Sequence, residues 1–110
     1  MLSQEIINRI INFGESSERL IGKQIKIRQE ISVNKDNFDR HFTCFTNFEF
    51  KLTHFGIRMS GQKMMFMGNE FNYEIDSRCL IEFQENNNDE YILIEKLSEE
   101  VYKKTFLNFK

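Results

Sequence analysis

The sequence predicts one α+β domain: a curved antiparallel meander or partial barrel of six to seven strands, with a short N-terminal helix and a C-terminal amphipathic helix. A chain of 110 residues has the usual size of one domain. Its hydrophobic residues make up 40% of the chain and include 12 Phe, enough to fill one core. Over the central part of the chain, short runs alternate apolar and polar residues, and turn-forming residues separate the runs. We therefore treat residues 1–110 as a single domain.

The first helix is expected over residues 3–13, where the apolar residues recur with helical spacing. These residues are Ile6, Ile7, Ile10, Ile11 and Phe13. Gly14 is expected to end this helix, because glycine is common just after a helix C-terminus. Residues 15–21 are expected to form a second short helical turn that ends at Gly22.

Seven strands are expected over residues 23–33, 40–53, 55–59, 64–67, 71–75, 79–85 and 91–95. Short turns join them, so neighbouring strands should be antiparallel with one buried face. In the second of these runs Phe48 and Phe50 point to the core, and Phe45 is the apolar exception on the polar face. A closing helix is expected over residues 98–109, capped by Ser98. One side of it would carry Leu97, Val101, Tyr102, Phe106 and Phe109.

Charge and cysteine content exclude several classes of protein. The net charge is −2, so no global field attracts nucleic acid or anionic lipid. No run approaches the ~18 apolar residues of a membrane span, and no secretory leader is recognisable. Two cysteines are too few for the disulfide framework of a small secreted domain. We expect a cytoplasmic protein without a membrane partner.

The residues that could hold a metal or act as nucleophiles are His41, Cys44, His54 and Cys79. Their spacing lacks the tight Cys or His pairs of zinc modules, and both cysteines fall on faces expected to be buried. No nucleotide-binding or hydrolase motif is present. We therefore expect no metal, no cofactor and no enzymatic activity.

The most informative segment is the hairpin around residues 59–68, which holds four of the five methionines. If it is a hairpin, Met64 and Phe66 face one side and Met65 and Met67 the other. The second face is either covered by a terminal helix or exposed as a surface for a partner protein, since methionine-rich patches adapt to varied partners. We take the partner-binding residues to be Met59, Met65, Met67, Arg58 and Lys63.

The function expected from these observations is a non-enzymatic protein-binding module. The chain lacks Ala, Pro and Trp, and Ile, Asn, Lys and Phe supply 45 residues, which suggests an AT-rich genome. A small accessory inhibitor or regulator of phage or mobile-element origin fits, for example an anti-defence protein such as an anti-CRISPR.

Two alternatives remain, and the sequence also leaves open whether the chain forms a homo-oligomer. The first is a small-ligand binder that uses the Phe-rich concave sheet. The second is a single-stranded nucleic-acid binder that stacks a base on Phe45 beside Lys26 and Arg28. Interspersed glutamates on the same outward positions make nucleic acid the weakest of the three.

Overall fold

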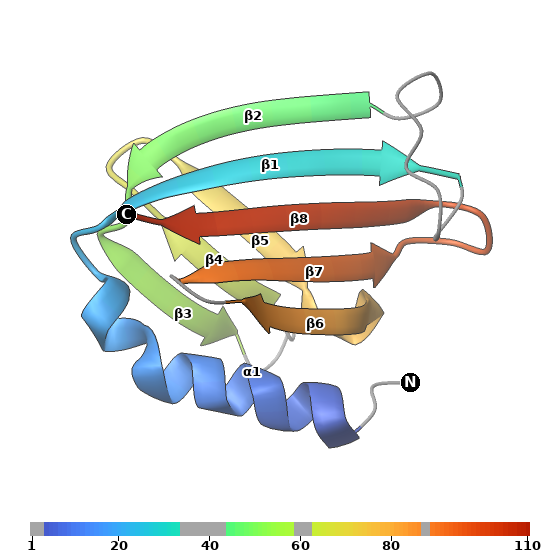
Figure 1. Ribbon diagram of the computed structural model, residues 1–110, viewed down its shortest axis with the longest axis horizontal. Helices are drawn as coiled ribbons and strands as arrows, with labels where there is room; N and C mark the ends of the chain where they lie inside the picture. The colour runs from blue at the N-terminus through green and yellow to red at the C-terminus, as the bar shows by residue number, and fades with distance from the viewer. Residues whose placement is uncertain (1–3, 34–43, 59–62, 87–88) are drawn as a thin grey trace.

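The computed structural model describes residues 4–33, 44–58, 63–86 and 89–110. Within these ranges the chain forms one α-helix and eight strands. The strands make two antiparallel sheets, of strand order β2-β1-β8-β7-β6 and β3-β4-β5 (Figure 1). The elements are α1 (Gln4–Ser16), η1 (Ser17–Leu20), β1 (Gln24–Ser32), β2 (Cys44–Lys51), β3 (His54–Arg58), β4 (Lys63–Met67), β5 (Asn72–Asp76), η2 (Ser77–Cys79), β6 (Leu80–Asn86), β7 (Glu90–Lys96) and β8 (Tyr102–Phe109). The expected α+β class and antiparallel strands are confirmed, and the sheets form no closed barrel.

The core lies between the two sheets and is completed by α1. The three-stranded sheet lies across one face of the five-stranded sheet, and α1 runs beside β3 and β6 (Figure 1). Each sheet turns alternate residues inward, as the period of a half-buried strand requires. The fully buried side chains include Ile25 and Ile27 of β1, Leu107 of β8, and Met64 and Phe66 of β4.

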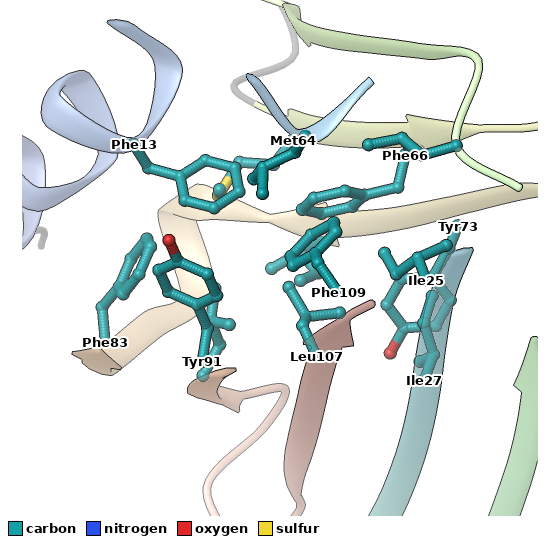
Figure 2. Packing of buried hydrophobic residues seen from close by; sticks show 14 of the residues in the cluster. Phe13, Ile25, Ile27, Met64, Phe66, Tyr73, Phe83, Tyr91, Leu107 and Phe109 are labelled. Carbon is teal, nitrogen blue, oxygen red and sulfur yellow. The ribbon is translucent and has the colours of Figure 1, made fainter. Parts of the chain in front are cut away.

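Aromatic rings from both sheets meet around Phe13 of α1 (Figure 2). The ring centroid of Phe13 lies 4.9 Å from that of Tyr91 and 5.2 Å from that of Phe55, both edge-to-face. Phe66 and Phe109 also lie within ring-contact distance of Phe13. Edge-to-face pairs add to the burial of each ring. Phe13 therefore joins the helix to both sheets.

The helix α1 extends two residues beyond the expected stop at Gly14, so that expectation is wrong. Here glycine serves close packing, because a Cβ at this position would lie 3.2 Å from Cδ1 of Ile57 in β3. The expected second helical turn is confirmed as η1. After it the chain reverses at Gly22, whose φ of 94° is a conformation that favours glycine.

The expected C-terminal helix over residues 98–109 is wrong, because this segment forms β8. The strand lies in the middle of the five-stranded sheet and pairs with both β1 and β7. Its buried residues are Thr105, Leu107 and Phe109, which alternate with period two. Pairing on both sides satisfies the backbone along the whole strand, and this outweighs the weak helical pattern. The end of β7 is instead joined to β8 by a turn, in which Leu97 N donates to Val101 O.

Asp89, in the turn before β7, forms salt bridges with Arg19 and Lys23. Its carboxylate lies 2.6 Å from Nη1 of Arg19 in η1 and 3.0 Å from Nζ of Lys23. Arg19 also donates to the hydroxyl of Tyr91. These hydrogen bonds, first from Arg19 and then from Lys23, lower the pKa of Asp89.

Among the described residues, no helix is long and apolar enough to cross a membrane.

Candidate functional site

The methionine hairpin has the alternation that the sequence predicts. Met64 and Phe66 are fully buried and point into the core (Figure 2). Met65 and Met67 lie on the opposite face of β4 and are half-buried. The helix α1 packs against the inner side of the core through Ile10 and its neighbours, so it does not cover this second face. The alternative in which a C-terminal helix covers this face is wrong, because that segment forms β8.

We define the methionine face as the outward side of β3-β4-β5, centred on Met65 and Met67. Met65 lies opposite Gly56 and Glu74, and Cε of Met65 would be 3.5 Å from a Cβ on Gly56. Since Gly56 has no side chain, Met65 lies over the bare backbone of β3. Charged residues stand beside this apolar centre: Nζ of Lys63 is 3.2 Å from Oε1 of Glu74.

The remaining residues predicted for this site are only partly described. Lys63 begins β4 and pairs in register with Arg58, the last residue of β3. Met59 lies outside the described residues. The structure thus brings Lys63, Met65 and Met67 to one face of one strand.

A second cluster, of polar residues, lies between the sheets and was not predicted. The hydroxyl of Tyr73 in β5 lies 2.8 Å from Oγ1 of Thr105 in β8 and donates to Oε1 of Gln29 in β1 at 3.1 Å. Nζ of Lys103 lies 5.0 Å from the centre of the Tyr73 ring and 3.2 Å from Oε1 of Glu95. This cluster connects the three-stranded sheet to three strands of the other sheet.

Glu95 is only 2% exposed, which is unusual for a carboxylate. Its Oε2 accepts a hydrogen bond of 3.1 Å from the backbone amide of Asp76. Its Oε1 makes an ionic contact with Lys103 and accepts no well-directed hydrogen bond. Burial raises the pKa of Glu95, and Lys103 opposes that shift. Burial likewise raises the pKa of Tyr73.

Shifted pKa values are common in active sites, but they also occur in structural ion pairs. Here the Tyr73 hydroxyl and both carboxylate oxygens of Glu95 each contact another protein atom. The cluster serves as a polar tie between the sheets. The sequence analysis overlooked that residues 102–109 also alternate with the two-residue period of a strand. Lys103 and Thr105 reach the interior only if that segment is a strand.

The outer face of the five-stranded sheet carries a depression of about 490 Å³. Its lining residues are Lys26, Arg28, Glu30, Asn47, Phe106 and Asn108. Arg28 is already engaged, since its Nε lies 2.7 Å from Oε2 of Glu30 and its guanidinium lies 4.8 Å from the centre of the Phe45 ring. Across the strands, Glu49 is paired in register with Lys26. The face is therefore of mixed charge, as expected.

The two basic residues considered for nucleic acid, Lys26 and Arg28, share the outer face of the five-stranded sheet with Phe45, but not all other basic residues of the chain join them there. Lys26, Arg28 and Lys51 lie outward on the five-stranded sheet, whereas Lys63 lies on the other sheet and Lys23 contacts Asp89. A phosphate-tracking groove needs its cations on one continuous surface. The arrangement gives nucleic-acid binding no support.

The soft ligands are also dispersed. His54 begins β3, Cys79 ends η2 and Cys44 begins β2, while His41 lies outside the described residues. In the part of the chain that the structure describes, no three His, Cys, Asp or Glu residues gather as a metal site would require. Burial raises the pKa of the Cys79 thiol, which disfavours the reactive thiolate.

Comparison of the chain with models of protein families, with curated proteins and with solved structures finds no match in any of the three. The geometry of the molecule therefore carries the functional argument.

Proposed function

We propose that the protein is a non-enzymatic protein-binding module and that the methionine face is its docking surface. One observation carries the proposal: β4 buries Met64 and Phe66 completely while it holds Met65 and Met67 only half-buried on the opposite face. Neighbouring apolar side chains at outward positions of a strand form an apolar patch, and such patches often mark a surface that binds another protein. Flexible thioether side chains suit an apolar patch on another protein.

The composition of the face fits such a partner. An interface commonly has an apolar centre and a polar rim. Met65 and Met67 form the centre, and the paired Lys63 and Glu74 stand at its side. The expected partner is a protein with a complementary apolar patch and polar groups around it. An inhibitor or regulator acts through such contacts without chemistry of its own.

The alternative of a small-ligand binder is less well supported. That function needs space inside the Phe-rich sheet. The rings of Phe13, Phe66 and Phe109 instead contact one another where such a ligand would sit (Figure 2), and Phe55 packs against Phe13. These phenylalanines serve as core.

The test replaces both outward methionines by serine, Met65→Ser with Met67→Ser, and compares this variant with the parent. Because the two side chains are half-buried and not fully buried, each change should cost less than the ~2–5 kcal/mol of a buried methionine truncation. Met64→Ser on the same strand is the matched control for burial, and it should lower the melting temperature sharply.

Binding is measured by affinity capture from lysate of the organism that carries the gene, quantified by mass spectrometry. A second control, Ile11→Ser with Leu97→Ser, removes two exposed apolar side chains elsewhere, which are 49% and 45% exposed. The proposal expects a protein that the parent and this control retain and the methionine variant loses. Retention by the folded methionine variant would overturn the assignment of this face.

A further inference from the structure

The free edges of the two sheets differ in how they are protected. An unpaired strand edge invites pairing with another chain, and proteins usually shorten or cover such edges. The edge strand β6 lies against α1, where Nη1 of Arg9 donates to the carbonyl oxygen of Phe83 at 2.6 Å. The strands β3 and β5 are only five residues long, and the amide of Asp76 in β5 donates to Glu95.

Of the fourth edge strand, β2, the C-terminal end is covered by Gly68, on which a Cβ would lie 3.0 Å from Lys51 O, but the described residues show no such cover over Phe45 to Glu49. The strand is eight residues long and pairs with β1 along its length, and it lies at the open side of the five-stranded sheet (Figure 1). Within the described ranges, no strand pairs with its other side. The chain contains no proline that could block the edge.

The side of β2 that offers its backbone can be worked out from the ladder. Leu52, directly after the strand, donates its amide to Lys23 O and accepts from Gly22 N. In an antiparallel ladder the N–H and C=O of alternate residues point to the same side. The even-numbered residues of β2 therefore bond to β1, and the backbone groups of Phe45, Asn47 and Glu49 point to the open side, whereas Lys51 O faces Gly68.

A second copy of the same strand is complementary to this edge in one antiparallel register. With the two-fold axis at Phe48, Asn47 lies opposite Glu49 of the second copy. This pair, formed twice, allows an amide–carboxylate hydrogen bond. An axis at Glu49 would instead place two glutamates opposite each other.

The inward side of the edge also favours burial. Phe48 is half-buried and stacks on Phe50, with 6.3 Å between ring centroids. Phe71, which is 48% exposed, stacks on the other side of Phe50 at 5.4 Å. In the register above, Phe48 meets Phe48 of the second copy, so aromatic surface leaves water when the strands pair.

We propose that the protein forms a symmetric dimer by antiparallel pairing of β2 with β2 of a second copy, with the two-fold axis at Phe48. The surface is distinct from the methionine face. The dimer joins the two five-stranded sheets into one continuous sheet.

The test uses opposite charges at Asn47. In the dimer, residue 47 of each copy lies opposite Glu49 of the other copy. Asn47→Glu therefore creates two repulsive pairs, and Asn47→Lys creates two attractive pairs. Each cross-strand charge pair shifts pairing modestly, so the dimer dissociation constant should rise roughly 2- to 30-fold for glutamate and fall by a similar factor for lysine. Sedimentation equilibrium over micromolar to millimolar concentrations measures this constant.

The same substitutions have the opposite effect on the isolated chain, which separates association from folding. Asn47 lies opposite Arg28 in the β1–β2 register. Glutamate there gains an attraction within one chain and lysine a repulsion, so Asn47→Glu should be the more stable monomer and the weaker dimer. Far-ultraviolet circular dichroism confirms that both variants fold.

Three results would overturn the proposal. The first is a parent that stays monomeric up to millimolar concentration, as it would if the edge took an extended segment of a different protein. The second is a dimer whose dissociation constant is the same in both Asn47 variants. The third is a dimer abolished by Met65→Ser with Met67→Ser, which would place the contact on the methionine face.

Discussion

Phe13→Ala tests whether one helical side chain joins α1 to both sheets. The ring of Phe13 is 4% exposed, so its removal leaves a cavity in the centre of the core. Truncation of a buried phenylalanine costs about 3–5 kcal/mol. The edge-to-face contacts with Tyr91 and Phe55 place the expected loss at the upper end of that range. This is a large share of the ~5–15 kcal/mol that stabilises a domain.

Urea unfolding, followed by circular dichroism, gives the change in free energy. With a slope of about 1–3 kcal/mol per molar urea, the midpoint should fall by at least about 1 M. Ile11→Ala on the same helix is the control, because Ile11 is 49% exposed and should cost under ~0.5 kcal/mol. Similar midpoints for the two variants would show that α1 does not pack as described.

Two further predictions concern the turns. The pKa of Asp89 is lowered by its two cationic partners, so its stabilisation is present above the ordinary pKa of Asp and is lost as pH falls. Asp89→Asn should therefore lower the urea midpoint at neutral pH and change it little in acid; equal losses at both would contradict the ion pairs. Gly68→Ala places a Cβ 2.7 Å from Cδ2 of Phe50 and should cost about 1–3 kcal/mol. Gly56→Ala, with ordinary 3.5 Å spacing, should unfold close to the parent in the same assay.

Local patterns were sufficient to predict most of the strands. The alternation in β1 and the burial of Met64 and Phe66 follow from period two and from turn residues between the runs. In each case the apolar side chains of one strand suffice to define the buried face. The prediction that Met65 and Met67 lie on the face opposite Met64 rests on the same argument, whereas the pattern left open whether that face is covered.

The C-terminal strand could not be predicted in this way, because its identity depends on distant neighbours. Tyr102 to Phe109 offers apolar residues at both helical and strand spacing. Pairing with β1 and β7 decides between them. The polar cluster of Glu95 and Lys103 was missed for the same reason, since the contact between these two residues exists only once β8 lies beside β7.

The proposed function depends on β4 burying Met64 and presenting Met65 and Met67 on an accessible face. Methionine oxidation by dilute hydrogen peroxide, followed by peptide mass spectrometry, measures the accessibility of each thioether in the folded protein. We expect Met65 and Met67 to oxidise at similar rates and Met64, with no exposed surface, to stay protected until the protein unfolds. Equal protection of all three methionines would contradict this expectation, because the proposed docking face would then be covered.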